Sequence, residues 1–243
     1  MIKEIGRVIA LYRYPVKSMA GEPLDSATLG WHGFTGDRRF AFIRVGNQTG
    51  FPWLSASKLP QLICYKPYSR DLKESADLPT HVRTPAGREV ELRGEELREE
   101  LSTAYGSEVE VMQLKHGVFD EADVSIISQS TINAVEQETG IRLEIERFRP
   151  NVVVETLEGK PFEEDGWVGK IIRFGRDKDA PAINVFMRDV RCVMVNLHPS
   201  TAEANPNVMK SVVRMNKNCA GAYASALKTG IVSVGDKIFL DDI

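Results

Sequence analysis

Short β-type segments separated by turn residues run through most of the sequence, and this pattern limits the possible folds most strongly. Residues 5–14 are a β-branched and aromatic run that ends at Pro15, and residues 40–45 are followed by the turn pair Gly46-Asn47. Short strands divided by glycine-rich turns are typical of small barrels, whereas parallel sheets alternate strands with helices. We therefore expect a mainly β or α+β fold with a few short helices, and we disfavour a parallel crossover topology.

Other segments carry strand or helix signals of their own. Further strands are predicted at residues 25–29, 62–66, 89–92, 108–114, 124–127, 152–154, 167–174, 182–187, 193–197, 222–227, 231–234 and 237–240, the last two joined by Gly235-Asp236. Helices are predicted at residues 94–106, after a cap at Ser128 or Ser130, and from Asn205-Pro206. We divide the chain into an N-terminal β-barrel-like module, residues 1–94, and a C-terminal module, residues 95–243.

Composition and charge argue against several classes of protein. The 243 residues carry 31 Lys and Arg against 34 Asp and Glu, a formal charge of -3, so no nucleic-acid partner is indicated. No apolar run approaches the roughly 18 residues that span a bilayer, and no signal-peptide core is visible, so no membrane attachment is expected. The three widely spaced cysteines, Cys64, Cys192 and Cys219, favour a reducing, cytoplasmic setting over a disulfide framework.

The stretch from residue 186 to residue 199 places one thiol, Cys192, beside concentrated charge. Apolar residues alternate from Val193 to Leu197, which predicts a strand with one buried face. In such a strand Cys192 and Arg191 would point to opposite faces. A lone strand cysteine is most often a small buried hydrophobe, so this plain interpretation stands beside a chemical one.

Four separated places put a cation or a small polar group where a strand meets a turn. They are Lys17-Ser18, Arg38-Arg39, Arg149 with Asn151, and Arg191 beside Cys192. A cleft that collects these cations would suit a multiply charged oxyanion such as a phosphate, because guanidinium and ammonium groups bind oxyanions with charge-assisted hydrogen bonds. Glycine-rich phosphate loops are absent from the sequence, which argues against P-loop and dinucleotide sites. The alternative is that each cation is a separate surface charge.

Five short motifs stand in order along the chain: Tyr14-Pro-Val-Lys-Ser18, Gly36-Asp-Arg-Arg39, Arg147-Phe-Arg-Pro-Asn151, Val190-Arg-Cys192 and Gly235-Asp236. This order resembles the MOSC family, the C-terminal domain type of molybdenum cofactor sulfurase. The N-terminal part is similar to the β-barrel domain that precedes MOSC in the mitochondrial amidoxime-reducing component and its bacterial relatives. The resemblance implies a MOSC N-terminal β-barrel domain over residues 1–94 and a MOSC β-barrel over residues 95–243.

The resemblance also implies a cofactor and the residues that hold it. In this family the molybdenum of the molybdopterin cofactor is bound by one protein cysteine, which matches Cys192 as both metal ligand and catalytic residue. A soft thiolate suits a metal that is already bound to sulfur. The residues that match the family's contacts to the pterin and its phosphate are Lys17, Ser18, Arg38, Arg149, Asn151 and Arg191. Strand alternation would turn Arg191 away from the metal unless a bulge intervenes.

The chain departs from its relatives at several points. Ser57 stands where the family usually carries an arginine, which weakens one pterin contact unless Lys58 substitutes. The sequence ends at Ile243 without the ferredoxin domain of some bacterial relatives, and it lacks the aminotransferase-like domain of the full sulfurase. Cys64 and Cys219 match no ligand cysteine and are interpreted as structural.

The resemblance therefore implies a cofactor-dependent oxidoreductase that reduces a small N-hydroxylated molecule. A separate electron-transfer protein, either a ferredoxin or a flavoprotein reductase, would supply the electrons. Two alternatives stay open: a non-catalytic carrier of molybdenum cofactor or of sulfur, and a protein that binds pyridoxal phosphate. The last would need a Schiff-base lysine, and Lys17 is the lysine of the cationic cluster.

Overall fold

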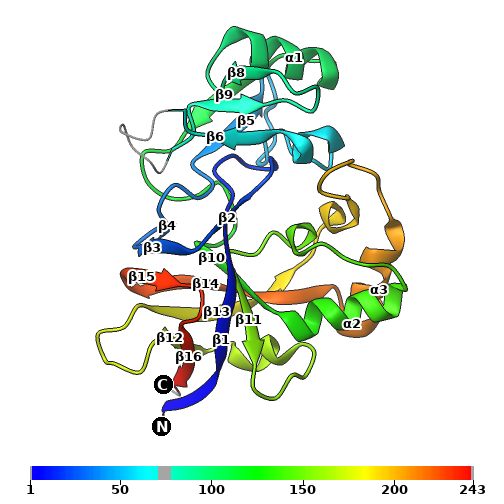
Figure 1. The fold of residues 1–243 in the computed structure, drawn as a ribbon. Coiled ribbons are helices and arrows are strands. Elements are labelled where there is room, and N and C mark those ends of the chain that lie inside the picture. The colour runs from blue at the N-terminus through cyan, green and yellow to red at the C-terminus, as the bar shows by residue number, and fades with distance from the viewer. Residues whose placement is uncertain (1, 71–77, 242–243) are drawn as a thin grey trace.

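Seven strands close into one β-barrel in the computed structural model, which describes residues 2–70 and 78–241 (Figure 1). Around the barrel the strands follow the order β11 (Val152–Thr156), β10 (Val124–Ser128), β14 (Cys219–Lys228), β13 (Ala182–Val190), β12 (Lys170–Phe174), β16 (Lys237–Asp241) and β1 (Ile2–Arg13). The barrel closes because β1 also pairs with β11. The expectation of a mainly β fold with a few short helices is confirmed.

Strand β1 closes the barrel because it is long enough to pair with three other strands. It pairs with β16 and β11 along its length, and its last three residues pair with β2 (Glu22–Leu24). Gly6 lies where β1 crosses β11. A Cβ at this position would lie 2.2 Å from the carbonyl oxygen of Glu155, so glycine lets the two backbones approach. Val8 and Leu11 of β1 belong to the apolar core inside the barrel.

Two small sheets and one helix form an upper module that lies over the barrel (Figure 1). One sheet pairs β5 (Phe40–Arg44) with β9 (Val109–Gln113), and the other contains β6 (Lys66–Tyr68), β7 (His81–Arg83) and β8 (Glu89–Glu91). We use the term upper module for the elements from β5 to β9. A further sheet beside the barrel contains β15 (Gly230–Ser233), β3 (Ser26–Gly30) and β4 (Gly33–Phe34).

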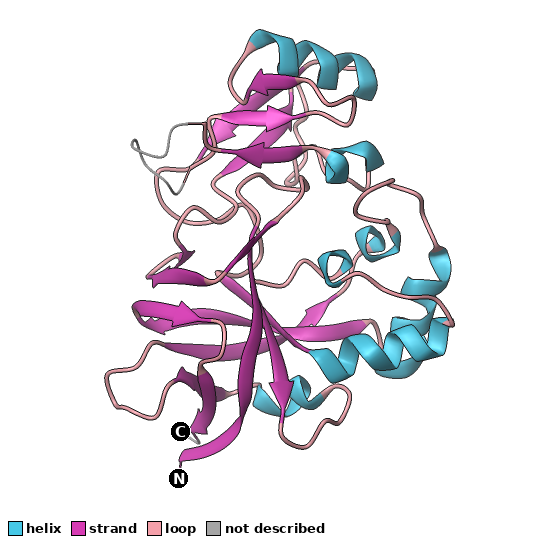
Figure 2. Ribbon diagram, viewed as in Figure 1, coloured by secondary structure: helices cyan, strands magenta, loops and turns pink. Residues whose placement is uncertain are grey.

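Three α-helices occur in the described residues, and they lie where the sequence predicts them (Figure 2). Helix α1 (Glu95–Tyr105) ends at Gly106, whose left-handed backbone forms the C-cap. Helix α2 (Gln129–Thr139) is capped by Ser128, and α3 (Pro206–Asn216) is capped by Asn205. Four short 3-10 helices complete the structure: η1 (Pro60–Cys64), η2 (Ile145–Arg147), η3 (Glu163–Trp167) and η4 (Val193–Asn196).

Two predicted strands are wrong, because the chain turns into 3-10 helices there. Residues 62–66 contain the end of η1, so Cys64 lies on a helical turn and β6 starts only at Lys66. Residues 193–197 contain η4, where the Val195 amide donates to the Cys192 carbonyl at 3.1 Å. The alternation of Val193, Val195 and Leu197 has the period of a strand, but Val193 is exposed in η4 and the buried residues of this turn, Val195 and Asn196, are adjacent.

Two expectations about strand pairing are also wrong. Strands β10 and β11 are parallel and are joined through α2, so the barrel contains the crossover that the sequence disfavoured. Strands β15 and β16 do not form a hairpin, because β15 pairs with β3 whereas β16 pairs with β1 and β12. Each of these pairings joins segments that are distant in sequence, so local turn signals could not show them.

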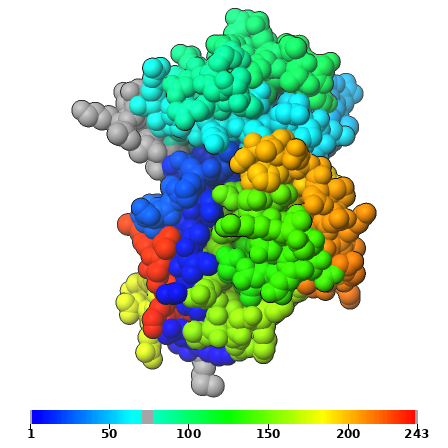
Figure 3. Space-filling model, turned by 45° about the vertical axis from the view of Figure 1, so that its right-hand side comes forward, coloured from blue at the N-terminus to red at the C-terminus, as the bar shows by residue number. Residues whose placement is uncertain are grey.

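The boundary between residues 94 and 95 stays a prediction. One hydrophobic core contains residues from both sides of this boundary. Leu97 and Leu101 of α1 pack in it together with Leu197 and Ala202, which come after β13 in the sequence. Figure 3 shows the segment near residue 200 resting against the upper module. Within residues 2–70 and 78–241, no helix combines the length and apolar character needed to cross a membrane.

Candidate functional site

The predicted site residues lie on four loops, which meet one another and a fifth loop, residues 114–123, between the barrel and the upper module. Direct contacts join these loops in pairs: Lys17 Nζ donates to the Phe119 carbonyl at 2.7 Å, and Ser18 Oγ lies 3.8 Å from Met194 Sδ. Arg38 and Arg191 bind the carbonyl oxygens of Arg149 and Phe148. The structure therefore brings together the four places that the sequence singled out.

Arg38 is the centre of a buried network. It forms an ion pair with Asp37, its Nε lies 2.6 Å from Asp120 Oδ2, and its side chain is only 5% exposed. Its remaining donors reach the Asn151 side-chain oxygen at 3.2 Å and the Arg149 carbonyl at 3.0 Å. Burial lowers the pKa of Arg38, but Asp37 and Asp120 raise it, and the net direction is upward. Arg38 therefore stays charged and holds neighbouring loops in place.

Asn151 completes this network from the barrel side. It is fully buried, and its side-chain oxygen accepts from the Ser125 amide at 3.0 Å as well as from Arg38. Its side-chain nitrogen donates to the Tyr12 carbonyl at 3.3 Å. Asn151 thus joins β1, β10 and Arg38 behind the site. Its predicted direct contact with a cofactor stays a prediction.

Three of the site residues have left-handed backbones, which non-glycine residues seldom adopt. They are Ser18 (φ 66°), Arg38 (φ 44°) and Arg149 (φ 49°). Such backbones persist where surrounding contacts hold them, and they gather at functional sites. The bond from Arg38 to the Arg149 carbonyl is one such contact. The sequence does not show this feature, because the conformation comes from contacts between loops.

Arg149 and Lys17 have unused donors, unlike Arg38. Arg149 Nη1 donates to the Met19 carbonyl at 2.7 Å, and no other hydrogen bond of its guanidinium is recorded within the described part of the chain. Burial lowers the pKa of Arg149 to about 10, with the charge of Arg38 acting in the same direction, so it remains a cation at neutral pH. Burial also lowers the pKa of Lys17, while Asp120 raises it. These two groups can receive an anion.

Arg191 lies beneath the thiol loop. It binds the carboxylate of Asp189 and the Phe148 carbonyl, and its side chain is 10% exposed. A register shift after Arg188 and the end of β13 at Val190 break the alternation that would have turned Arg191 away. Its Nε is buried without a hydrogen-bond partner among the described residues.

Cys192 is exposed, so the interpretation of this cysteine as a buried hydrophobe is wrong. It lies at the start of η4, between the exposed side chains of Val190 and Val193. Burial lowers the pKa of both Lys17 and Arg191, and the negative charge of a Cys192 thiolate is one of the nearby charges that raise these pKa values. The other two cysteines differ, because burial raises the pKa of Cys64 and of Cys219. Cys192 is the accessible thiol of this cationic region.

The residues present fit a metal that brings most of its own ligands. Among residues 2–70 and 78–241, no group of three or more His, Cys, Asp or Glu side chains is arranged to hold a metal ion. One exposed thiolate can supply a single soft ligand, which suits molybdenum already bound to sulfur. The free donors of Arg149 and Lys17 can bind an anionic group on the same ligand. The donor set therefore matches a sulfur-ligated, phosphate-bearing metal cofactor.

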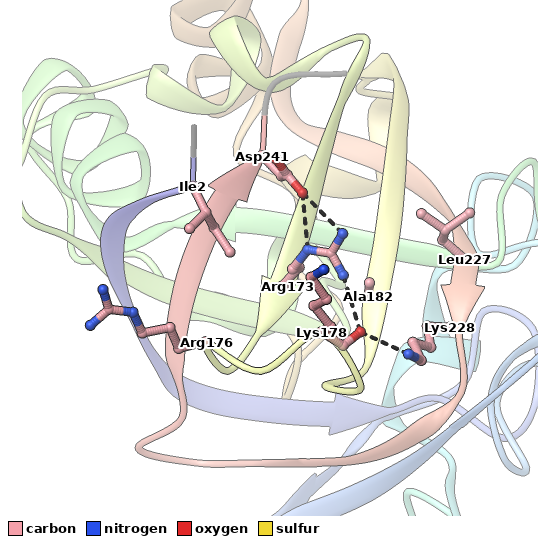
Figure 4. A pocket seen from close by; sticks show the side chains of 8 residues that line it. All are labelled: Ile2, Arg173, Arg176, Lys178, Ala182, Leu227, Lys228 and Asp241. Carbon is pink, nitrogen blue, oxygen red and sulfur yellow. Dashed lines mark hydrogen bonds and ion pairs between the residues drawn. The ribbon is translucent and has the colours of Figure 1, made fainter.

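A cavity of about 570 Å³ lies elsewhere, at the ends of β13 and β14 far from Cys192 (Figure 4). Some of its arginine and lysine side chains are paired with carboxylates of the same chain: Arg173 binds Asp241 at 2.9 Å, and Lys228 binds the exposed Asp179 at 2.6 Å. A smaller cavity of about 210 Å³ lies along β3. Neither cavity contains a residue of the predicted site.

The sequence did not identify some residues of the site, and one residue that it grouped with the site, Arg39, lies outside the network. Arg39 donates to the Leu114 carbonyl at 3.1 Å, so it fixes the chain after β9. The missed residues are the acidic partners Asp37, Asp120 and Asp189. A signal for them existed, because buried arginines need carboxylates nearby. The sequence alone does not identify which carboxylates pair with which arginine.

Comparison with protein-family models places the chain in a class. The model of the MOSC N-terminal beta barrel domain matches residues 5–132, and the model of the MOSC domain matches residues 113–239. Together they cover almost the whole chain. The chain therefore belongs to the MOSC domain family, as the sequence motifs predicted.

Individual relatives are distant. A molybdenum cofactor sulfurase of Drosophila mojavensis is 23% identical over 91% of this chain, which spans 32% of that protein's length. The YuaD protein of Bacillus subtilis has a solved structure that covers 100% of both chains with a TM-score of 0.53 and 16% identity. That likeness supports the fold alone. The family and the sulfurase relative point to a function related to molybdenum cofactor.

Proposed function

We propose that this protein binds molybdenum cofactor between its barrel and its upper module, with Cys192 as the metal ligand. The observation that carries the proposal is the exposed Cys192 thiol on a segment that contacts the loops of two cations with unused donors, Arg149 and Lys17. A lone thiolate supplies one metal ligand, and the cations match the negative end of a phosphate-bearing cofactor. The exposed position also leaves the metal accessible to a substrate.

The protein residues act by binding and orienting. Hydrogen bonds of Arg38, Asn151 and Arg191 join the loops that carry Arg149, Lys17 and the thiol, and so fix their relative positions. When bound, the cofactor would supply the redox chemistry that removes oxygen from a small N-hydroxylated substrate. That reduction consumes two electrons and two protons and releases water.

The electrons would come from a separate protein, either a ferredoxin or a flavoprotein reductase. The 243 residues contain three dispersed cysteines, fewer than the four thiolates of an ordinary iron–sulfur cluster, and they lack a glycine-rich dinucleotide motif. Cofactor-loaded protein should therefore reduce a benzamidoxime-like substrate with a reduced viologen dye, and a nicotinamide cofactor alone should give no turnover. Steady turnover with the nicotinamide cofactor and no second protein would contradict this prediction.

A second candidate is a carrier that delivers the cofactor or its sulfur, with Cys192 bearing a persulfide. The exposure of Cys192 favours it, since a transferable sulfur must be reachable, and the relative named a molybdenum cofactor sulfurase is in keeping with it. Full molybdenum occupancy without turnover by the dye would favour the carrier. Pyridoxal phosphate has weaker support, because a Schiff base would consume the lysine of the cationic cluster, Lys17, and break its hydrogen bond to the Phe119 carbonyl.

A further inference from the structure

Tyr14 lies beneath the two arginines of the site. The guanidinium carbon of Arg149 is 4.3 Å from the centre of the Tyr14 ring, and that of Arg38 is 5.1 Å from it. Tyr14 has no exposed surface. Stacking of a guanidinium on a desolvated aromatic ring is attractive because the ring face is negative. The ring therefore contacts both the arginine that is fully bonded and the one that has free donors.

The surrounding backbone fixes the position of this ring. The Tyr14 amide donates to Asp37 Oδ1 at 2.6 Å, and the Tyr14 carbonyl accepts from the Arg38 amide at 2.8 Å. Gly21 leaves room for the ring, since a Cβ at residue 21 would lie 2.3 Å from Tyr14 Cε1. The backbone of Tyr14 is therefore tied to Asp37 and Arg38, and its ring packs closely against the backbone of Gly21.

The hydroxyl group of Tyr14 does not explain why a tyrosine side chain is buried here. It has no hydrogen-bond partner among the described residues, and an unsatisfied buried hydroxyl is unfavourable. Burial raises the pKa of Tyr14, although Arg149 and Arg38 lower it, so the phenol stays neutral. The ring face is thus the part of Tyr14 that makes the useful contact, because it can hold a cation without neutralising it.

We propose that Tyr14 is a positioning residue whose ring holds the Arg149 guanidinium ready to bind the anionic end of the ligand. A carboxylate partner would occupy the donors of Arg149, as Asp37 and Asp120 occupy those of Arg38. An aromatic face supports the same group and leaves the donors free. The inference rests on the anion-binding part of the proposed function, and it is independent of the metal chemistry.

The test uses inorganic pyrophosphate as the probe, with its affinity for the metal-free full chain measured by titration calorimetry. Tyr14→Phe keeps the ring and should bind within about twofold of wild type. Tyr14→Leu removes the ring and should bind roughly tenfold more weakly, as should Arg149→Ala. The double variant Tyr14→Leu/Arg149→Ala should bind no more weakly than Arg149→Ala alone, because Tyr14 acts through that arginine. Tyr14→Met replaces Tyr14→Leu if circular dichroism shows that the latter is unfolded.

Three results would overturn the inference. A tenfold loss in Tyr14→Phe would show that the hydroxyl contacts the anion, and additive losses in the double variant would show that Tyr14 acts independently of Arg149. Pyrophosphate that does not bind to the wild-type protein would remove the anion site itself. A different outcome separates the two proposals. If pyrophosphate binds as expected but the protein never retains molybdenum, the proposed metal site is wrong and the role of Tyr14 still holds.

Discussion

Arg38→Met tests the buried network most severely, because it removes a cation and leaves its partners in place. Arg38 contacts Asp37, Asp120, Asn151 and the Arg149 carbonyl. Methionine is long and flexible, so it fills much of the space that the arginine side chain leaves. The loss would therefore come mainly from the broken ion pairs, and Asp37 would remain completely buried without its cation.

The magnitude follows from the burial of the partners. Removing one member of a buried ion pair typically costs about 3–5 kcal/mol, because it leaves an uncompensated charge. Asp37 meets this condition, whereas the Asp120 side chain is 24% exposed and adds less, since solvent screens it. A loss of about 3–5 kcal/mol is a large part of the roughly 5–15 kcal/mol that stabilises an ordinary domain.

The assay is urea unfolding followed by circular dichroism, and Arg39→Met is the matched control. Arg39 is the next residue, but its guanidinium binds the backbone carbonyls of Leu114 and Lys115 and no buried carboxylate. Its loss should cost less, about 1.5–3 kcal/mol, because it breaks hydrogen bonds to neutral carbonyls and leaves no buried charge unpaired. If Arg38→Met proves no more destabilising than Arg39→Met, the network is not the support that we infer.

Two further predictions concern charge at the site. Although burial raises the pKa of Asp120, Arg38 and Lys17 lower it, and its net shift is downward. Its stabilising effect is therefore present above the unfolded pKa, near 4, and is lost as pH falls through the lower folded pKa. The stability gap between wild type and Asp120→Asn in urea should narrow below about pH 4, and a gap independent of pH would argue against the ion pair. Arg149→Ala and Lys17→Ala should each weaken cofactor binding roughly tenfold to a hundredfold, at about 1.5–3 kcal/mol per charge-assisted contact. Glu96→Ala on the exposed face of α1 should not change the affinity, and equal affinities for all three variants would make these cations ordinary surface charges.

Local signals in the sequence were enough to place most helices and strands. The caps at Ser128 and Asn205 and the left-handed Gly106 mark helix ends through bonds within a few residues, so they can be found without tertiary information. The 3-10 turn after Cys192 could not be found in this way. The apolar residues Val193, Val195 and Leu197 are spaced as in a strand, although the first of them is exposed.

The motifs predicted that the cationic places converge, but they did not predict the contacts that each side chain makes. The motifs grouped Lys17, Arg38, Arg149 and Arg191, and the structure brings them together. Which of these cations keep free donors depends on carboxylates far away in the sequence, such as Asp120 for Arg38. The same limit applies to the left-handed backbones, which contacts between loops hold in place.

The central claim is that Cys192 holds the metal, and elemental analysis of freshly purified protein tests it most directly. Molybdenum per chain should be measured for wild type, Cys192→Ala and the control Cys64→Ala. Cys192 is exposed, so its replacement should not affect folding. The account predicts close to one atom per chain in wild type and in Cys64→Ala, and almost none in Cys192→Ala. Equal molybdenum in Cys192→Ala and wild type would contradict it.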